Sequence, residues 1–483
     1  MKINPFIFRN YDIRGIVDVD LDAKKVECIG KAYGTFLRRR KIRQAVVGRD
    51  CRLSGEEYQN ALIKGMTAVG VDVIDLGMVM TQMVYYGQYR FQTNGGVMVT
   101  ASHNPWNFNG FKMAIGYSRT TETPDVEEIR SIVEKENFFV SDKKGVVTKL
   151  SGAKKKAFVA DYMADVLKRV VLKRKFKVVL DAGCGTTGPV NKMIFEKAGC
   201  KVIGQHLKID GHFPIGTPDP TATVVMERVR ETVLKHKADL GVAFDGDGDR
   251  IGVVDENGNI LWNDVLVAIF AKEILERFPK SKIVHNGLCS QLTSKVVELN
   301  GGTPIMWRTG HAFIKSKIAE ENAAFGGELS GHFFFADNAY GHDDGTYAVL
   351  RVLEYLSDKN KSLSELYSEF PSYISSPEIK IGCPDDKKVE VVRDLSVKFK
   401  KDFPNAKITD ASTIPGDDGT RADFADGMMI FRYSQNGPYI TVKFEAKDQK
   451  TYDERKRYVK AMLKSYPEMV WEDQLAVNLS SLD

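Results

Sequence analysis

Apolar residues recur at helical spacing over residues 24–40 and 56–69. Between and after these segments stand short runs rich in β-branched residues, each bounded by glycine or turn residues, at residues 45–47, 71–76 and 97–100. Helices and strands therefore alternate in this part of the chain. Such repeated α/β units predict sheets that are covered by helices.

The alternation returns farther along the chain. Strand-like runs cover residues 176–180, 238–244 and 283–285, and a glycine-rich turn at 183–188 follows the first of them. A further strand at 251–254 precedes a helix that begins near residue 263. The charged stretch 141–156 and the polar stretch 371–390 are expected to be linkers.

The last hundred residues have a different pattern. They predict a helix over 387–399, strands over 428–432 and 439–445, and a closing helix near 452–465. This order predicts a smaller α+β domain at the C-terminal end. At 483 residues, the whole chain has room for three or four domains.

Composition narrows the class of protein. An apolar fraction of 43% with 28% charged residues is ordinary for a globular chain, and the net charge of +5 is small and interspersed, so we expect no nucleic acid partner. The six cysteines form no Cys-x-x-Cys pair, which argues against zinc and disulfide frameworks. No run is long enough for a membrane helix and no secretion signal is evident, so the cytoplasm is the expected location.

The densest chemical signal is the hexapeptide 245–250, in which Asp245, Asp247 and Asp249 alternate with glycines before Arg250. Glycines allow a tight curve that turns all three carboxylates inward, where a hard divalent cation such as Mg²⁺ would neutralise them. An EF-hand would require glycine where Arg250 stands, and strands rather than helices flank this loop. A solvated acidic turn remains the plain alternative.

A second signal, Thr100 to Pro105, follows a predicted strand and places Ser102 just beyond its carboxyl end, where ligand sites gather in α/β sheets. Adjacent residues of an extended chain point to opposite sides, which argues against a hydrolytic Ser102–His103 pair. The chain also has neither a Gly-x-Ser-x-Gly elbow nor a P-loop. An ordinary capped turn is the alternative.

Together these two loops resemble the phosphoserine and metal loops of the α-D-phosphohexomutase superfamily. Further similar motifs follow in the same order: 8–15 (Phe-Arg-Asn-Tyr-Asp-Ile-Arg-Gly), 48–50 (Gly-Arg-Asp), 109–112 (Asn-Gly-Phe-Lys), 307–311 (Trp-Arg-Thr-Gly-His) and 327–332 (Gly-Glu-Leu-Ser-Gly-His). The resemblance implies three related α/β domains and a smaller α+β domain around a central cleft. The corresponding boundaries are 1–150, 151–256, 257–370 and 371–483.

The resemblance also indicates an activity. The motif around Leu329 is similar to the phosphomannomutase/phosphoglucomutase branch, whereas phosphoglucosamine mutases usually carry glutamine there. The implied reaction interconverts hexose 1-phosphates and 6-phosphates of mannose or glucose, through a hexose 1,6-bisphosphate, in a monomer or small homo-oligomer. Phosphoglucosamine mutase, or a sugar-phosphate binding protein without turnover, remains an alternative.

The resemblance assigns roles to individual residues. Ser102 carries the phosphoryl group and, with the three aspartates, holds Mg²⁺; Lys112 and His332 are candidates for acid/base work, and Arg250 is placed among the catalytic residues. The residues expected to bind substrate are Tyr11, Arg14, His103, Arg250, Arg308, His311, Glu328, Ser330, Arg432, Ser434 and Asn436. The chain departs from the family pattern at 435–437 (Gln-Asn-Gly), and at 284–287 (Val-His-Asn-Gly), where relatives often have a basic residue that meets phosphate.

Overall fold

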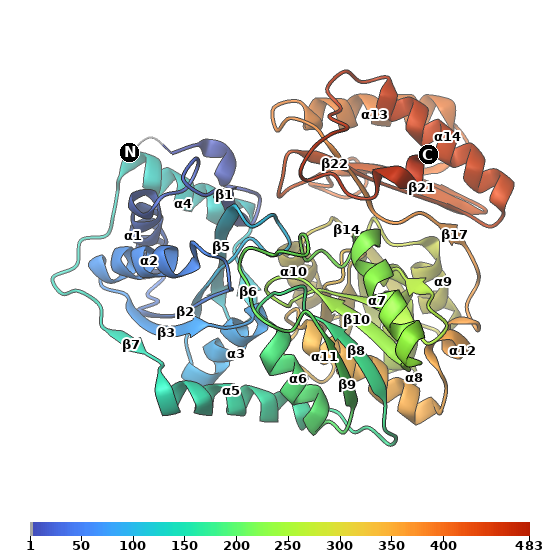
Figure 1. Cartoon of the computed structure of the whole chain (residues 1–483). Helices are drawn as coiled ribbons and strands as arrows, with labels where there is room; N and C mark the ends of the chain where they lie inside the picture. The colour runs from blue at the N-terminus through green and yellow to red at the C-terminus, as the bar shows by residue number, and fades with distance from the viewer. Residues whose placement is uncertain (1–2) are drawn as a thin grey trace. The chain divides into compact units, whose positions relative to one another are not determined.

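The computed structural model (Figure 1) describes residues 3–483. The chain divides into two compact units. The first unit comprises Met1–Asp219, Ala243–Arg250 and His342–Glu354. The second comprises Pro220–Val242, Ile251–Gly341 and Tyr355–Asp483. The chain passes from the second unit back into the first within strand β10 (Leu240–Phe244), so the first unit receives the acidic loop as a separate short segment.

The first unit is built on a seven-stranded sheet with the order β1-β5-β4-β2-β3-β7, in which β6 pairs with β5. The central strands β4, β2 and β3 are parallel, whereas β5 is antiparallel to its neighbours β1 and β4. The strands are β1 (Asp12–Ile16), β2 (Gln44–Arg49), β3 (Asp72–Met78), β4 (Gly95–Val99), β5 (Phe108–Gly116), β6 (Arg119–Thr120) and β7 (Val147–Lys149).

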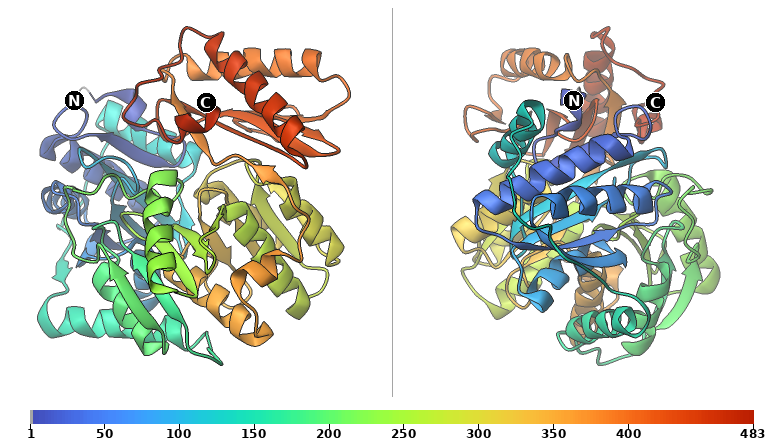
Figure 2. Two further views of the ribbon diagram at one scale, coloured as in Figure 1. Left: turned by 45° about the vertical axis from the view of Figure 1, so that its right-hand side comes forward. Right: turned by 90° about the vertical axis from the view of Figure 1, so that its left-hand side faces the viewer.

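Helices cover both faces of this sheet because its side chains alternate between two apolar faces. Ala45 and Val47 of β2 belong to the core beneath α1, α2 and α4, whereas Val46 points toward α3 on the opposite face. Figure 2 shows α1 and α2 side by side. The helices are η1 (Pro5–Ile7, 3₁₀), α1 (Ala23–Arg39), α2 (Gly55–Ala68), α3 (Thr81–Phe91) and α4 (Thr123–Lys135).

The rest of the first unit continues the α/β alternation. Strands β8 (Lys177–Asp181) and β9 (Lys201–Gln205) are parallel, and α6 (Gly188–Lys197) connects them. Helix α5 (Gly152–Leu167) precedes them, and the first ten residues of α11 (Gly345–Lys359) also belong to this unit.

The second unit contains a four-stranded sheet with the order β14-β13-β15-β16 and an antiparallel pair, β11 and β12. The strands are β11 (Ile251–Asp255), β12 (Ile260–Leu261), β13 (Lys282–Asn286), β14 (Thr303–Trp307), β15 (Phe325–Gly327) and β16 (Phe333–Phe335). The helices are α7 (Thr223–His236), α8 (Asn263–Arg277), α9 (Gln291–Leu299), α10 (His311–Glu321) and α12 (Leu363–Tyr367).

The C-terminal part of the second unit is an antiparallel sheet of order β17-β22-β21-β20-β19, with β18 also paired to β22. Helices α13 and α14 pack on one face around a core that includes Phe399 and Phe431 (Figure 1). The elements are β17 (Ile374–Ser375), β18 (Ile379–Gly382), α13 (Lys388–Asp402), β19 (Lys407–Asp410), β20 (Gly419–Phe424), β21 (Gly427–Tyr433), β22 (Tyr439–Ala446), α14 (Gln449–Lys464) and η2 (Leu479–Leu482, 3₁₀).

The predicted α/β class and the smaller α+β region near the C-terminus are confirmed. The two expected linkers are partly wrong. Residues 147–149 form β7 and the lysine-rich segment from residue 152 opens α5, because lysine and alanine favour helix even when they are exposed. The stretch 371–390 contains β17 and β18, whose few residues give too short an alternation to identify from the sequence.

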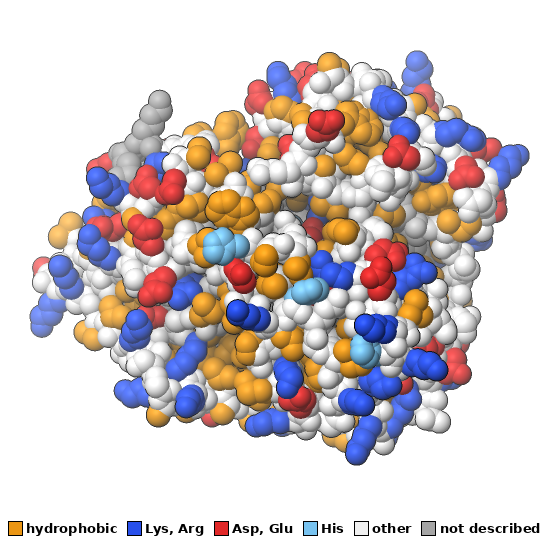
Figure 3. All heavy atoms as spheres, viewed as in Figure 1, with side chains coloured by type: hydrophobic (Ala, Val, Ile, Leu, Met, Phe, Trp, Pro, Cys, Tyr) orange, Lys and Arg blue, Asp and Glu red, His pale blue; other side chains and the backbone are white. Residues whose placement is uncertain are grey.

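Two further observations concern the surface. On the face drawn in Figure 3, the acidic and basic side chains are interspersed. Within residues 3–483, no helix combines the length and the apolar character that crossing a membrane would require.

Candidate active site

The serine loop begins directly after β4, as the sequence predicts. Ser102 is fully buried, and its backbone adopts φ +54°, in the left-handed region that residues other than glycine rarely occupy. Its hydroxyl Oγ donates a hydrogen bond of 2.7 Å to Oδ2 of Asp245. The first unit therefore brings the serine loop and the acidic loop into direct contact.

The expected separation of Ser102 and His103 is wrong. Nδ1 of His103 lies 3.2 Å from Oγ of Ser102, within hydrogen-bonding distance. The prediction assumed an extended chain with side chains on opposite sides, but the left-handed conformation of Ser102 turns the two side chains toward each other. His103 is thus a neighbour of the serine hydroxyl.

The acidic loop joins β10 to β11, so strands flank it on both sides as predicted. Asp245, Asp247 and Asp249 are fully buried and each offers an oxygen within 4.8 Å of the others. Gly248 adopts φ +85°, and the backbone N–H groups of Gly248 and Arg250 donate to Oδ1 of Asp245. The glycines allow the tight curve that the sequence pattern suggested.

Gly246 has a further steric role at this contact. A Cβ atom at this position would lie 2.7 Å from the carbonyl oxygen of Ser102, closer than non-bonded carbon and oxygen atoms approach. Glycine therefore lets the acidic loop pack against the backbone of the serine loop.

Lys112 on β5 reaches into the carboxylate cluster. Its Nζ donates 2.8 Å to Oδ2 of Asp247 and also bonds Asp249. Burial acts to lower the pKa of Lys112, but the nearby carboxylates outweigh it and the pKa is raised, so the side chain is an ammonium. Thr81, at the start of α3, donates 2.6 Å to the same oxygen of Asp247.

The surroundings shift the pKa values of Asp245 and Asp247 in opposite directions. Burial, followed by repulsion from Asp247 and Asp249, raises the pKa of Asp245 well above its usual range. Burial also acts to raise the pKa of Asp247, but Lys112 outweighs it and the pKa is lowered. Asp245 therefore requires more additional positive charge than Asp247 before it can ionise.

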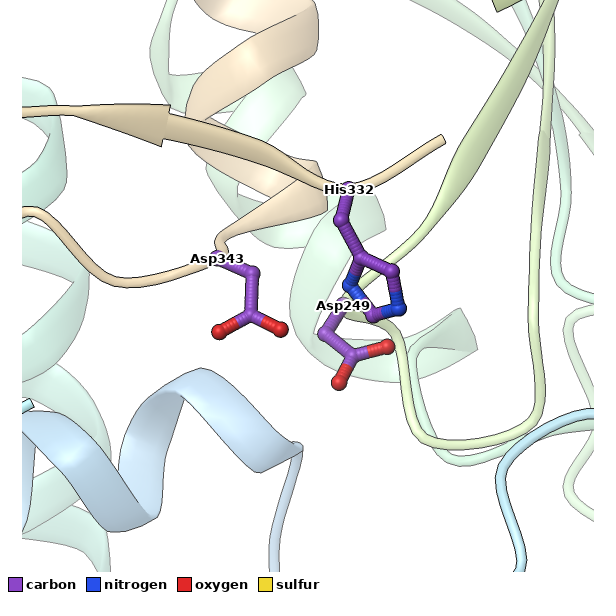
Figure 4. Close-up of side chains that lie close together, drawn as sticks. All are labelled: Asp249, His332 and Asp343. Carbon is purple, nitrogen blue, oxygen red and sulfur yellow. The ribbon is translucent and has the colours of Figure 1, made fainter. Parts of the chain in front are cut away.

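A fourth carboxylate borders the cluster. Asp343, in the segment before α11, is buried, and one of its oxygens lies within 4.8 Å of a carboxylate oxygen of Asp249; Figure 4 shows these two side chains. The third side chain drawn there, His332, belongs to the second unit. The sequence analysis did not identify Asp343 or Thr81, because single polar residues outside a dense motif carry no distinctive pattern.

The acidic loop fits a bound cation. Oδ1 of Asp247 is buried and accepts no hydrogen bond from any residue of the described chain, which leaves it available as a ligand. Carboxylate oxygens are the ligands that hard divalent cations prefer, and another positive charge would also relieve the repulsion felt by Asp245. The three aspartates predicted from the sequence are thus placed together in a manner suited to metal binding.

Other predicted residues of the first unit lie near these loops. Arg14 on β1 donates 3.0 Å to Asp12 and 3.4 Å to the carbonyl of Ala101, and Tyr11 is also buried. Burial acts to lower the pKa of Arg250, yet Asp245 and Asp249 outweigh it and raise the pKa. The Nε atom of Arg250 lies 3.9 Å from Oδ2 of Asp245.

In the second unit, the motif at 307–311 meets the motif at 327–332. Oε1 of Glu328, which follows β15, accepts 2.8 Å from the backbone N–H of Gly310 at the start of α10. The rings of His311 and His332 are 5.5 Å apart, and the guanidinium of Arg308 lies 3.6 Å from the ring centre of Phe313. Ser330 lies partly exposed in the turn between Glu328 and His332.

His285 does not supply a basic group to this region. The side chain is buried on β13, where Nε2 lies 2.9 Å from Oγ of Ser294, and burial lowers its pKa to about 4. The neighbouring Asn286 accepts 3.2 Å from the backbone N–H of Leu329. Where relatives often have a basic residue, this chain therefore has the buried side chain of His285, whose imidazole is neutral at pH 7.

Of the C-terminal candidates, Arg432 lies on β21, and Ser434 and Asn436 lie in the loop between β21 and β22. Nε of Arg432 donates 3.0 Å to Oδ1 of Asp418, and Gln435 bonds the same carboxylate. Oγ of Ser434 accepts 3.1 Å from the backbone N–H groups of both Asn436 and Gly437, which fixes the turn. Arg432 is thus buried in an ion pair that the sequence did not reveal, since Asp418 is distant in the chain.

Comparison with known protein families gives three matches in chain order. The family models are described as phosphoglucomutase/phosphomannomutase, alpha/beta/alpha domains I, II and III. They match residues 5–139, 157–258 and 262–373, respectively.

Similar proteins extend over nearly the whole chain. The chain is 36% identical to a phosphoglucomutase of Neisseria gonorrhoeae, over 96% of this chain and 98% of that protein. It is 38% identical to a phosphomannomutase/phosphoglucomutase of Pseudomonas putida, over 91% of each. A crystal structure of a phosphoglucomutase/phosphomannomutase family protein from Burkholderia thailandensis is similar with a TM-score of 0.83 and 33% identity, over 96% of this chain and 98% of that one.

Proposed function

Since the chain belongs to the phosphoglucomutase/phosphomannomutase family, we propose that it interconverts hexose 1-phosphates and hexose 6-phosphates of mannose, glucose or both. It is a mutase and therefore an isomerase. The observation that carries the residue-level proposal is the 2.7 Å hydrogen bond from Oγ of Ser102 to Asp245, within a loop of three buried aspartates. This contact supports the proposal that the nucleophile candidate lies beside a cation site.

In the proposed reaction, Ser102 holds a phosphoryl group. The bond between Oγ and phosphorus breaks as a free hydroxyl of the sugar phosphate attacks and forms the new oxygen–phosphorus bond. The proton of that hydroxyl passes to a base, and the departing Oγ takes up a proton to become a hydroxyl again. The product of this half-reaction is a hexose 1,6-bisphosphate, whose other phosphoryl group then returns to Ser102. The sugar leaves as the positional isomer.

Asp245, Asp247 and Asp249, with the phosphorylated Ser102, would hold Mg²⁺. When bound, the cation supplies positive charge that offsets charge on the transferring oxygens. Lys112 and Arg250 add the fixed positive charge that the chain itself contributes beside the aspartates. The cluster needs this compensation because its carboxylates are removed from water.

The remaining roles are also proposals. His332 is the candidate to accept a proton from a sugar hydroxyl, and Lys112, which is an ammonium, is the candidate to donate one. Glu328 and Ser330 are the candidates for recognition of those hydroxyls. Arg432, Ser434 and Asn436 are proposed to bind the phosphate that is not being transferred. Tyr11, Arg14, His103, Arg308 and His311 are also proposed to bind substrate, and the protein is proposed to be a cytoplasmic monomer or small homo-oligomer.

The central test compares the wild-type protein with Ser102→Ala in both directions, with mannose and glucose phosphates and a trace of the 1,6-bisphosphate. We expect the variant to lose nearly all turnover and the wild type to acquire one phosphate, detected by intact mass. Ser118→Ala is the matched control, because Ser118 is also a buried loop serine of the first unit. Near-normal turnover in Ser102→Ala would contradict the proposal.

Metal dependence is tested on the same preparation. EDTA should abolish turnover and added Mg²⁺ should restore it, whereas full activity after exhaustive chelation would contradict the cation role. Glucosamine 1-phosphate in the same assay separates the proposal from a phosphoglucosamine mutase. Phosphorylated Ser102 without any interconversion would instead support the binding protein without turnover.

A further inference from the structure

Arg52 lies beneath the serine loop and uses all of its hydrogen-bonding capacity there. It is among the largest fully buried side chains of the described residues. Nε donates 3.1 Å to Oδ2 of Asp50, and the two terminal nitrogens each donate to two carbonyl oxygens. Those carbonyls belong to Ser102 (2.8 Å), Asn104 (2.6 Å), Pro105 (2.6 Å) and Phe108 (3.0 Å). A guanidinium has five N–H donors, and each of them has a partner here.

Asp50 completes the support of the same loop from the other side. Its Oδ2 accepts 2.6 Å from the hydroxyl of Thr100, and the oxygen of that hydroxyl accepts 2.8 Å from the backbone N–H of Ser102. The carbonyl of Ser102 is bonded to Arg52. Both backbone polar groups of Ser102 are therefore held by the Asp50–Arg52 ion pair, one directly and one through Thr100.

This support coincides with an unusual backbone conformation. Ser102 adopts φ +54°, which is unfavourable for a residue with a Cβ atom and persists only where the surroundings determine it. In that conformation its hydroxyl reaches Asp245 at 2.7 Å. A relaxed backbone at Ser102 would rotate the hydroxyl away from the acidic loop, so the bonds from Arg52 and Thr100 bear directly on where Oγ lies.

The acidic loop is packed against the same support. The ring of Phe213 lies 5.2 Å from the guanidinium carbon of Arg52 and covers it. The ring also lies 3.5 Å from the position of a Cβ at Gly246. Because these contacts exclude water, the hydrogen bonds of Arg52 operate in a medium of low dielectric, where they are strong and directional.

We infer that Arg52 is a positioning residue for phosphoryl transfer: it holds the strained serine loop so that Oγ of Ser102 faces the acidic loop, without contacting the substrate. The inference rests on the proposed mutase function. It predicts that loss of the guanidinium impairs the transfer step while leaving sugar-phosphate binding intact. A residue that only stabilised the fold would lower the amount of active protein and leave the kinetic constants of the folded fraction unchanged.

The test is Arg52→Lys, which keeps the charge but offers three donors in place of five. We expect kcat to fall about 100-fold, since a displacement of about 1 Å costs roughly that factor. KM should change by less than about threefold, because uniform substrate binding is unaffected. Arg351→Lys is the matched control, because Arg351 is equally buried in the first unit, where it bonds Tyr347. This variant should keep the kcat of the wild type even if its thermal midpoint falls as much as that of Arg52→Lys.

A second variant covers the case in which Arg52→Lys does not fold. Thr100→Val removes only the relay between Asp50 and the backbone N–H of Ser102, and should lower kcat about tenfold with KM unchanged, as expected for loss of about one hydrogen bond. If Arg52→Lys folds and keeps kcat within about threefold of wild type, the inference is overturned. If Arg52→Lys does not fold, the same result for Thr100→Val overturns it.

A separate readout distinguishes this inference from the proposed function. The rate at which Ser102 takes up phosphate from glucose 1,6-bisphosphate can be followed by intact mass, independently of isomerisation. If the wild type takes up phosphate without interconverting sugar phosphates, the proposed function fails, and slower uptake by Arg52→Lys would still support the positioning role. Equal uptake rates in the two proteins would overturn it.

Discussion

The buried ion pair between Lys443 and Asp264 gives the sharpest stability prediction. Lys443 on β22 is fully buried and bonds Oδ2 of Asp264 at the start of α8, which also accepts 3.0 Å from the backbone N–H of Ser290. Lys443→Met keeps most of the side-chain volume but leaves the carboxylate buried without its cation. Breaking a buried pair in this way costs about 3–5 kcal/mol of the free energy of unfolding.

The same change should make stability depend on pH. Without the ammonium, the pKa of the buried Glu445 rises further in the folded state, because burial already raises it against the opposing effect of Lys443. The folded variant then binds more protons than the unfolded chain, so its stability rises as the pH falls. The penalty relative to wild type should therefore shrink between pH 8 and pH 5.

Urea unfolding followed by tryptophan fluorescence at several pH values measures both effects, with Trp262 directly before α8 as a reporter. The double variant Asp264→Asn/Lys443→Met should recover most of the loss, because it removes the carboxylate that has lost its direct cationic partner. Lys460→Met, which removes the exposed pair with Asp483, should cost less than about 0.5 kcal/mol. A loss below about 1 kcal/mol for Lys443→Met, or a double variant less stable than the single, would refute the reasoning.

Three further outcomes are expected. Gly65→Ala should destabilise by roughly 1–3 kcal/mol in thermal unfolding, because its Cβ would lie 2.1 Å from the carbonyl oxygen of Glu27 where α1 and α2 touch, whereas Gly116→Ala meets only ordinary contacts. Tyr33→Phe should cost about 1–3 kcal/mol in urea unfolding, since its buried hydroxyl bonds the backbone of both β4 and β5. Burial lowers the pKa of Lys155 to about 8, so the folded state releases its proton first; wild type should gain stability relative to Lys155→Met between pH 8 and pH 10.

The sequence predicts those elements of the fold whose apolar periodicity is long enough to identify. The helices α1 and α2 and the strands β2, β3 and β4 appear within a few residues of the predicted ranges. The pattern does not identify β7, β17 or β18, which have two to four residues each. The four-domain boundaries remain a prediction.

The candidate site was predictable where chemistry is concentrated in short motifs. Ser102 and the three aspartates could be singled out because carboxylates, glycines and a serine follow strand ends, and the structure brings them together. Arg52 and Asp343 could not be assigned in this way, since their importance depends on partners distant in the chain. The position of His103 was mispredicted because the backbone conformation of Ser102 is unusual.

The eight residues Ala243–Arg250 belong to the first unit, although the chain on both sides of them belongs to the second. Cleavage after Asp219 would consequently leave an N-terminal fragment with the nucleophile candidate but none of the three aspartates proposed to bind the metal. The complementary fragment would have these aspartates without the serine. Any single backbone cut between the two loops therefore leaves the serine and the three aspartates on different fragments. Neither fragment alone would contain both parts of the proposed site.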